Sequence, residues 1–556
     1  MGTMRAGEAA VRILQDRGVR YAFGVPGESF LGLLDALSHA SGIKLVSTRH
    51  EGGAAFMAEA VGKLTGVPAI CMGTRGVGSA NLAIGIHTAY QDSTPLLALV
   101  GQVETEFRHR EALQEVELAS FLGAVAKWAV EAPSASRLPE IVSEAYRRST
   151  SGRPGPVAIA LRGDILDEPV PDEFPQPTVR PATSIRTADA ATVVGLLAEA
   201  SAPLIIAGGG VLRAGATPQL VELAERLNVP VVTAFRRHDA FPNDHPLYLG
   251  PLSFGAATSV AARARAADVV LAIGTRLSEV TTLQYTVPSP GATLIHVDIS
   301  PEELGRVFPA RVALAADAAD FVAALLAASP ESRDGEREAQ NARDRAAYVA
   351  GSAPGGATVS DGVDPASIVA ELQRQLPPNA ILTSDAGNFW GWIVRHFRFR
   401  QPGTLLAPTS GAMGYAVPAA VAAALVTENR VPVVACAGDG GFLMTGSELA
   451  VAAQLGLKLT CLVFDNAMYG TIRLHQERAY PGRVAGTELW SPDLVRYAEA
   501  FGGLGIRVER DDEFPGALRT ALAHPGISVL SVAVAREQIA VGVQLSDLDG
   551  AGSAAR

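Results

Sequence analysis

The sequence predicts an α/β protein built from three doubly wound domains, each with a parallel sheet between two layers of helices. Two observations carry this prediction. Short apolar runs alternate with helix-length amphipathic stretches along nearly all of the 556 residues, as is typical of parallel sheets covered on both faces. The chain is also too long for one core, because single cores stop growing at about 250 to 300 residues. We therefore expect domains at 1–168, 188–328 and 363–540.

The expected strands are apolar segments that end in a polar or glycine-rich turn, where α/β proteins place their ligands. The first and third domains share one strand–helix rhythm, so we expect two copies of one architecture. A proline-rich stretch at 166–186 predicts an extended linker, a charged stretch at 328–362 predicts a separator, and the residues after 541 are expected to fray. The strands are expected at 19–27, 44–51, 68–74, 95–102 and 156–163, then at 203–211, 229–235, 269–276 and 293–300, and finally at 380–387, 431–439 and 458–466.

Composition excludes several classes of function. The net charge of −11 comes from 46 basic and 57 acidic residues without a lysine or arginine block, so we expect no nucleic-acid partner. No apolar run reaches the ~20 residues that a membrane span needs, and the first residues lack a signal pattern. Cys71, Cys436 and Cys461 stand far apart in apolar settings and are interpreted as buried, reduced thiols. We expect a soluble, cytoplasmic protein.

The strongest chemical signal is a pair of polar side chains at two strand ends in the third domain. Asp439 closes one strand and Asn466 the next, with 25 residues between Gly440 and Asn466, so both are expected at one crevice. Gly438, Gly440 and Gly441 let backbone approach a ligand closely. One carboxylate, one amide and one carbonyl suit a magnesium ion that completes its shell with diphosphate oxygens. The alternative is a tight turn with Asp439 as a helix cap.

This segment resembles the signature of thiamine-diphosphate enzymes, in which GDG is followed further along the chain by NN. The resemblance implies that Asp439, Asn466 and the main-chain oxygen of Met468 hold magnesium. Asp465 stands where the family usually has the first Asn; the metal ligand is the second, so binding is still expected. The resemblance also assigns cofactor contacts to Phe442, Tyr469 and Gly470.

In the first domain, Glu51 stands at a strand-to-helix junction within RHEGGAAFMAEA. On spacing alone, a Glu in a first helical turn is often only a partner of the helix macrodipole, contributing about 0.3 to 1 kcal/mol. The segment resembles that of acetolactate-synthase-like enzymes, whose Glu protonates the aminopyrimidine ring and helps to form the C2 carbanion of the thiazolium. This chemistry needs a carboxyl group that is shielded from water, so that its pKa rises. In the family the Glu and the diphosphate site come from different subunits.

The resemblance covers nearly the whole chain and implies a pyrimidine-binding, a central and a diphosphate-binding domain. In TSGAMGYAVPAA, the bulky Met413 matches the residue that bends the cofactor into a V, although a lone Met is more often core filler. Gln114 matches a glutamine that faces the reactive ring. The other implied cofactor contacts are Pro26, Gly387, Asn388 and Gly411. The remaining motifs are GVPGES at 24–29, the run at 74–103, ALQEVE at 112–117, SGRPGPVAIAL at 151–161, AGGGV, FPNDHPLYLG and VDISPEEL.

The implied function is that of a thiamine-diphosphate-dependent carboligase or lyase acting on 2-keto acids or 2-hydroxyacyl compounds through a C2 carbanion. His475 replaces a Trp that selects the second keto acid, Val280 replaces an Arg that reaches a substrate carboxylate, and Arg162 replaces a Lys. The acceptor is therefore expected to be an aldehyde, ketone or acyl thioester. His475 is a candidate proton donor, although a lone His is usually structural. His50, His87 and His109 stand near polar turns and are interpreted as structural.

The central domain leaves the question of a second cofactor open. AGGGV and IGTR end strands as in dinucleotide-binding folds, and relatives bind FAD there, but such turns also occur for packing alone. Two alternatives remain open, a flavin-dependent enzyme similar to pyruvate oxidase and a non-catalytic homologue. The resemblance implies a homodimer at minimum, and a homotetramer is the expected assembly.

Overall fold

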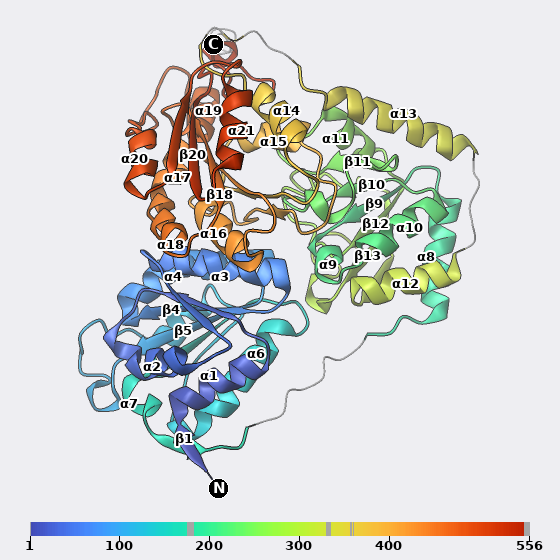
Figure 1. The fold of residues 1–556 in the computed structure, drawn as a ribbon. Helices are drawn as coiled ribbons and strands as arrows, with labels where there is room; N and C mark the ends of the chain where they lie inside the picture. The colour runs from blue at the N-terminus through green and yellow to red at the C-terminus, as the bar shows by residue number, and fades with distance from the viewer. Residues whose placement is uncertain (1, 175–182, 330–334, 356–358, 360, 550–556) are drawn as a thin grey trace.

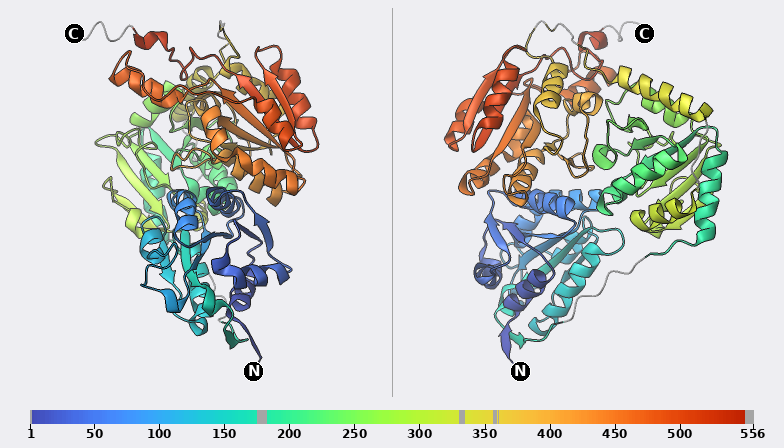
Figure 2. Two further views of the ribbon diagram at one scale, coloured as in Figure 1. Left: turned by 90° about the vertical axis from the view of Figure 1, so that its left-hand side faces the viewer. Right: turned by 45° about the vertical axis from the view of Figure 1, so that its right-hand side comes forward.

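The computed structural model describes residues 2–174, 183–329, 335–355, 359 and 361–549. It confirms the expected fold class, with three domains that each contain a six-stranded parallel sheet flanked by helices (Figure 1). The three domains form three lobes around a common junction (Figure 2). All twelve expected strands are present, since each strand predicted from the sequence overlaps one in the structure.

The first domain places its sheet in the order β3-β2-β4-β5-β7-β6, and β1 pairs antiparallel with β8. Strand β5 is buried along its whole length because helices cover both faces of the sheet. The strands are β1 (Thr3–Arg5), β2 (Tyr21–Gly24), β3 (Lys44–Ser47), β4 (Ala69–Thr74), β5 (Leu96–Gln102), β6 (Trp128–Glu131), β7 (Pro156–Arg162) and β8 (Pro169–Pro171). The helices are α1 (Ala6–Asp16), α2 (Leu31–His39), α3 (Glu51–Thr65), α4 (Arg75–Asp92), α5 (Leu118–Gly123), α6 (Leu138–Thr150) and α7 (Gly163–Leu166).

The central domain has the strand order β11-β10-β9-β12-β13-β14, which is that of dinucleotide-binding folds. The strands are β9 (Pro203–Ala207), β10 (Val231–Thr233), β11 (Tyr248–Pro251), β12 (Val269–Ile273), β13 (Thr293–Asp298) and β14 (Val312–Ala315). The helices are α8 (Thr187–Glu199), α9 (Gly209–Arg213), α10 (Thr217–Leu227), α11 (Thr258–Arg265) and α12 (Ala318–Ala328).

The third domain repeats the topology of the first, because its order β16-β15-β17-β18-β20-β19 also reads second, first, third, fourth, sixth, fifth along the chain. This confirms the expectation of two copies of one architecture. The strands are β15 (Ile381–Ser384), β16 (Leu405–Leu406), β17 (Val433–Gly438), β18 (Leu459–Asp465), β19 (Leu504–Val508) and β20 (Ile527–Ala533). The helices are α14 (Pro365–Gln375), α15 (Trp390–His396), α16 (Ala416–Val426), α17 (Asp439–Thr445), α18 (Leu449–Gln454), α19 (Gly470–Ala479), α20 (Leu494–Ala500), α21 (Phe514–Ala523) and α22 (Ser546–Asp549).

The segments between and after the domains are more ordered than their composition predicts. Helix α13 (Gly335–Gly351) occupies the charged stretch at 328–362 and packs on α11, with Tyr348 in the core of the central domain. The expectation that the chain frays after 541 is wrong up to residue 549, because Val543, Leu545 and Leu548 pack against Met468. In the predicted linker β8 is a strand, and residues 175–182 lie outside the described part of the chain.

The first and third domains share one hydrophobic core. Helix α3 of the first domain contacts α16 of the third, and residues of α3, α4 and α16 belong to one buried cluster. Helix α16 is almost entirely Ala and Val and nearly every residue of it is buried, so backbones approach closely. This contact fixes the sheets of the two domains relative to each other.

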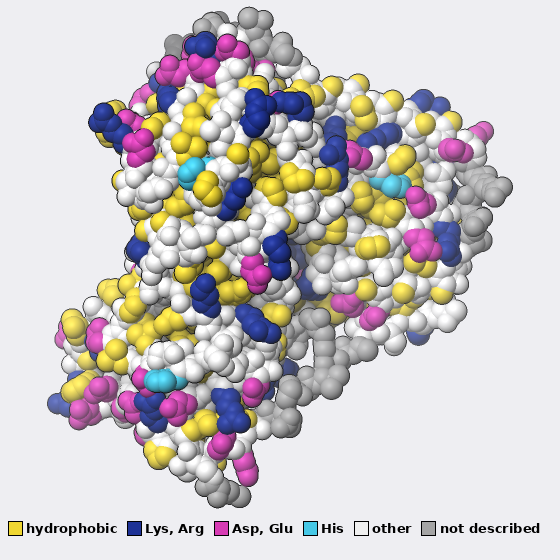
Figure 3. All heavy atoms as spheres, in the orientation of Figure 1, with side chains coloured by type: hydrophobic (Ala, Val, Ile, Leu, Met, Phe, Trp, Pro, Cys, Tyr) yellow, Lys and Arg dark blue, Asp and Glu magenta, His cyan; other side chains and the backbone are white. Residues whose placement is uncertain are grey.

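The remaining expectations from composition concern the thiols, the membrane and the surface. Cys71, Cys436 and Cys461 are buried and unpaired, as expected. None of the described helices is long and apolar enough to cross a membrane. The face of the molecule in Figure 3 carries basic and acidic side chains interspersed with hydrophobic ones.

Candidate active site

The predicted metal ligands lie at the ends of two adjacent strands. Strands β17 and β18 pair in parallel with Gly438 opposite Phe464, so Asp439 and the loop that begins at Asn466 leave the same edge of the sheet. The backbone N–H of Ala467 donates to the Asp439 carboxyl group. The structure therefore brings Asp439 and the Asn466 loop into direct contact.

Asp439 lacks a partner for one of its oxygens. Its side chain is 3% exposed; Oδ1 accepts the N–H of Gly440 at 2.8 Å, whereas Oδ2 is buried without a hydrogen-bond partner among the described residues. Burial, together with the neighbouring Asp465 carboxyl group, raises the pKa of Asp439 to about 6. A cation at Oδ2 would offset both effects.

The oxygens around Asp439 fit a magnesium ion. Asn466 Oδ1 accepts the N–H of Met468 at 3.2 Å, and the carbonyl oxygen of Met468 accepts that of Gly470 at 2.9 Å, which holds the loop in a tight turn. Within the described part of the chain, no group of three His, Cys, Asp or Glu side chains is placed to hold a metal. A carboxylate, an amide and a carbonyl oxygen suit magnesium when a ligand supplies further oxygens.

The glycines of the AGDGG segment are explained by close packing. A Cβ on Gly440 would lie 2.6 Å from Tyr469 Cε1, and one on Gly441 would lie 2.3 Å from Asp385 Oδ2. Gly438 lies further from its neighbour, with 3.6 Å to the ring of Phe389. The backbone of this segment is thus pressed between the Asn466 loop on one side and Asp385 on the other.

Asp385 is a site residue that sequence reasoning missed. It is buried directly after β15, and its carboxyl group accepts the N–H groups of Gly414, Tyr415 and Ala416, the last at 2.7 Å. Burial raises its pKa to about 6. These bonds fix the loop that carries Met413, which is half-buried. The polar residue at the end of ILTSD was the available signal, of the same kind that identified Asp439.

The loop around Met413 is also tied to the metal-binding segment. Gly411 and Gly414 have φ of +72° and +81°, a left-handed conformation that favours glycine. The Thr445 hydroxyl at the end of α17 donates to the carbonyl of Gly414 at 2.7 Å. Met413 and Asp439 therefore belong to one connected third-domain edge.

Asn388 joins this edge to the end of the chain. Its Nδ2 donates to the carbonyl of Ile539 at 3.0 Å, and its Oδ1 accepts the Thr471 hydroxyl at 2.9 Å. A Cβ on the neighbouring Gly387 would lie 2.7 Å from the ring of Phe389. Asn388 thus links the loop after β15 to α19 and to the C-terminal segment, a contact that local sequence patterns do not reveal.

The predicted first-domain residues gather around the start of α4. The carbonyl of Gln114, which has a φ of +63°, accepts the N–H of Gly76 at 3.0 Å, and Gln114 Oε1 is buried without a partner among the described residues. Pro26 lies in the exposed loop after β2, and its neighbour Gly27 touches Thr74, the last residue of β4. Gln114 and Pro26 therefore share one edge with Glu51.

Glu51 is the first residue of α3 and is half-buried. Asn81 Nδ2 on α4 donates to Glu51 Oε2 at 2.9 Å, and a Cβ on Gly78 would lie 3.4 Å from Oε1. Sequence reasoning did not identify Asn81. The residue before Glu51, His50, caps α3 by accepting the N–H of Gly52 at Nδ1, so its structural interpretation fits the structure.

Three further residues named in the sequence analysis, Phe442, His475 and Val280, have no described contact with the predicted metal ligands or with Glu51. The Phe442 ring is fully buried against Tyr497, so only its backbone can face a ligand. His475 is exposed on α19, one turn after the exposed Ile472, and Val280 is half-buried in the loop after β12.

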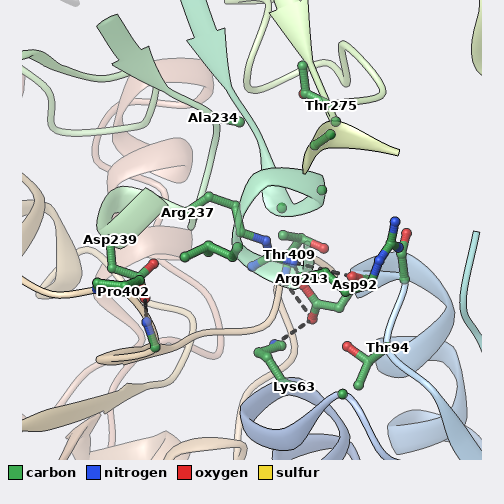
Figure 4. A pocket seen from close by; sticks show the side chains of 18 of the residues that line it. Lys63, Asp92, Thr94, Arg213, Ala234, Arg237, Asp239, Thr275, Pro402 and Thr409 are labelled. Atoms are coloured by element: carbon green, nitrogen blue, oxygen red, sulfur yellow. Dashed lines mark hydrogen bonds and ion pairs between the residues drawn. The ribbon is translucent and has the colours of Figure 1, made fainter. Parts of the chain in front are cut away.

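A separate cavity of about 550 Å³ lies where the three domains meet. The loops after β9, β12 and β13 line it, at the point where the strand order of the central sheet reverses. Figure 4 shows Arg213 and Arg237 from the central domain near Asp92 from the first, with Lys63, Thr94 and Thr409 around them, whereas Asp239 of the central domain lies beside Pro402 of the third. The size is typical of a small-molecule site.

Charged groups inside this cavity pair across domain boundaries. Asp92 of the first domain accepts from Lys63 of the same domain at 3.1 Å and from Arg237 of the central domain at 2.5 Å. Burial raises the pKa of Asp92, but the two cations outweigh it and lower the pKa to about 2. Asp239 Oδ1 and Thr409 Oγ1 have no hydrogen-bond partner among the described residues. The glycines of AGGGV need no ligand to explain them, since a Cβ on Gly208 would lie 2.2 Å from the carbonyl of Gly274.

Comparison with known proteins identifies the family. Models of the thiamine pyrophosphate enzyme match residues 4–121 as N-terminal TPP binding domain, 190–325 as central domain and 385–532 as C-terminal TPP binding domain. The chain is 33% identical to a probable acetolactate synthase large subunit of Methanocaldococcus jannaschii, covering 93% of this chain and 90% of the relative. It is 31% identical to the acetolactate synthase large subunit of Corynebacterium glutamicum (93% and 84% covered) and to that of isozyme 3 of Escherichia coli (94% and 93%).

Proposed function

Because the chain belongs to the thiamine pyrophosphate enzyme family and is a thiamine-diphosphate-dependent, acetolactate-synthase-like enzyme, we propose that it is a carboligase or lyase acting on 2-keto acids or 2-hydroxyacyl compounds. The contact between Asp439 and the Asn466 loop, with a buried unpartnered carboxylate oxygen, is the observation that carries the proposal. When bound, thiamine diphosphate would supply a nucleophilic thiazolium carbon and a ring that takes up the electrons released when a bond to the carbonyl carbon breaks.

The third-domain edge holds the cofactor in this proposal. Asp439 Oδ2, the Asn466 amide oxygen and the Met468 carbonyl bind magnesium, and the donor set on this edge fits that ion. Backbone of the AGDGG segment and Gly387 and Asn388 face the diphosphate. The half-buried Met413 supports the cofactor from the loop that Asp385 fixes.

The first-domain edge supplies the proton chemistry. Glu51 holds a proton against a nitrogen of the aminopyrimidine ring, with its Oε2 fixed by Asn81. Gln114 directs its unpartnered Oε1 at the reactive ring. Following the family resemblance, in which the Glu and the diphosphate site come from different subunits, we propose that Glu51 serves the cofactor of a second copy, in a homodimer or a homotetramer of cytoplasmic location.

The acceptor is proposed to be an aldehyde, ketone or acyl thioester. Val280 offers no charge for a second carboxylate, and loss of a bidentate Arg partner costs more than loss of packing. His475, exposed on α19, is the proposed proton donor to the new alkoxide.

The test is a substrate screen combined with a Glu51→Gln variant. Purified protein with thiamine diphosphate, magnesium and pyruvate or other keto acids should release carbon dioxide or a ligated product. Glu51→Gln should lower turnover by about 10²- to 10⁴-fold and leave cofactor affinity unchanged. Glu140→Gln is the matched control. Glu140 also lies in a first helical turn, that of α6, so its substitution removes the same kind of interaction with a helix macrodipole. Equal turnover of both variants would reject the role of Glu51.

The cavity at the domain junction favours a second candidate function. Its position at the strand-order reversal and its four arginines, Arg153, Arg213, Arg237 and Arg276, suit the diphosphate of a flavin nucleotide such as FAD. A flavin-dependent oxidase would be yellow as purified and would consume oxygen with pyruvate. A non-catalytic homologue would bind no thiamine diphosphate in a titration with magnesium.

A further inference from the structure

Glu448 is a buried carboxyl group of the third domain that reaches into the first. It ends a 3₁₀ turn (Gly446–Glu448) that directly follows α17, the helix that begins with Asp439. Glu448 Oε1 accepts the backbone N–H of Arg49 at 3.1 Å and that of His50 at 2.9 Å, and Oε2 accepts that of Arg49 at 3.2 Å. The side chain has no exposed surface. It therefore holds the two residues that immediately precede Glu51.

The first domain is shaped to receive this carboxyl group. A Cβ on Gly53, in the first turn of α3, would lie 2.4 Å from Glu448 Oε1, so only glycine leaves room for it. The Arg49 side chain is directed elsewhere, since its guanidinium donates to the Ser47 carbonyl at 2.9 Å and to Gln454 Oε1 at 3.1 Å. Glu448 is thus paired with backbone N–H groups rather than with a cation.

Burial of a carboxyl group without a salt bridge is costly, and it raises the pKa of Glu448 to about 7. A hydrophobic contact would join the domains at lower cost, as the α3–α16 interface already does. The feature that an apolar side chain lacks is the ability to fix backbone N–H groups in one orientation. Those of Arg49 and His50 set the start of α3, because the His50 carbonyl accepts the N–H of Ala54 at 3.1 Å.

We propose that Glu448 is a positioning residue for Glu51, and that it couples the metal-binding helix of a chain to the activating carboxyl group of the same chain. Glu448 fixes the backbone at the start of α3, while Asn81 fixes the Glu51 side chain. The inference rests on the proposed role of Glu51. Since Glu51 is proposed to serve the cofactor of the second copy, Glu448 connects the metal site of one cofactor with the proton chemistry of the other.

The experiment measures exchange of the C2 proton of bound thiamine diphosphate for deuterium. Holoenzyme with thiamine diphosphate and magnesium is mixed with D₂O, quenched in acid and read by proton NMR, so no substrate is needed. Glu448→Ala should slow exchange by about tenfold or more, because a small misplacement of a catalytic group has large effects. Glu448→Gln keeps an oxygen that accepts both N–H groups and should remain within about threefold of the parent rate.

Two further variants separate positioning from domain docking. Glu303→Ala is the matched control, because Glu303 is a buried carboxyl group that also bridges two domains, through Arg153 at 3.1 Å, but does not contact the Glu51 segment. It should exchange at the parent rate. Gly53→Ala should slow exchange by displacing Glu448, and should add little to Glu448→Ala, where the Cβ has room.

The outcomes distinguish this inference from the proposed function. If Glu51→Gln exchanges at the parent rate, the assignment of Glu51 fails, and the positioning role with it. If Glu51→Gln is slow and Glu448→Ala is not, only the positioning role is overturned. Equal slowing by Glu448→Ala and Glu303→Ala would also overturn it. If Glu448→Ala does not fold, Gly53→Ala decides: slow exchange supports the proposal and parent exchange rejects it.

Discussion

The first and third domains have the same strand order and present different chemistry at the same edge. In the third domain, Asp439 follows β17 and Asn466 follows β18. In the first, the topologically equivalent β4 and β5 are followed by Arg75 and Val103. An arginine and a valine cannot bind a cation, whereas a carboxylate and an amide can. The shared topology therefore sets where a ligand can lie, and the residues after each strand decide which ligand it is.

The edges also differ in how their backbones are packed. Arg75, Gly76 and Val77 begin α4, whereas Asp439, Gly440 and Gly441 begin α17. The Val77 side chain is about half exposed, but the place of a side chain on Gly441 is filled by Asp385. At this third position of the helix, the third-domain edge thus has a close contact where the first-domain edge has an exposed side chain.

The largest effect is expected from removal of the carboxylate that distinguishes the two edges. Asp439→Ala should weaken magnesium-dependent binding of thiamine diphosphate by at least about 100-fold, because it removes one of the proposed metal ligands. Titration of tryptophan fluorescence with the cofactor, at fixed magnesium, measures the affinity.

Asp465→Asn is the matched control for Asp439→Ala. Asp465 is the adjacent buried carboxyl group, but it pairs with Arg507 at 2.7 Å and with Ser491 at 3.0 Å, so it is not expected to bind the metal. Its substitution should weaken cofactor binding by less than about tenfold. A larger loss for Asp465→Asn than for Asp439→Ala would reverse the assignment of the ligand.

A smaller effect is expected from filling the space at Gly441. Gly441→Ala should destabilise the protein by about 3 kcal/mol, since the new methyl group displaces the buried Asp385 carboxylate from its backbone partners. Gly195→Ala in α8, where a Cβ meets open space, should instead stabilise by up to about 1 kcal/mol. Thermal unfolding of both variants measures the difference, and equal midpoints would show that Asp385 moves aside freely.

The fold and the placement of the proposed third-domain ligands at neighbouring strand ends could be predicted from the sequence because their signals are local. Asp439 and Asn466 follow apolar strands at a characteristic spacing, and each lies where its strand ends. The contact of Glu448 with His50 joins residues 398 positions apart, so no window of sequence contains it. The C-terminal segment was expected to fray because chain ends commonly do, but Leu545 and Leu548 pack on a cluster that includes Met468, a surface that only the folded chain provides.

The smallest effect is expected from the pH dependence of Glu448. Its pKa in the folded protein is about 7 and lies above the ordinary value of 4.5, so the folded state binds the proton more tightly. The resulting stability is present in full below pH 4.5 and is lost as the pH rises through about 7. Between pH 5 and pH 7 the parent should therefore lose about 2 kcal/mol that Glu448→Gln, which cannot ionise, retains.

Comparison of the parent with Glu448→Gln cancels the pH-dependent contributions that the other titrating groups make to stability. Asp385 and Asp239, whose pKa values burial raises to about 6, are present in both proteins, as is His238, whose pKa burial lowers to about 3. The thermal midpoint of the cofactor-free parent should fall by a few degrees relative to that of Glu448→Gln when the pH is raised from 5 to 7. A constant difference between the two midpoints would mean that the N–H groups of Arg49 and His50 keep Glu448 ionised throughout this range, because a carboxylate that accepts backbone hydrogen bonds resists protonation.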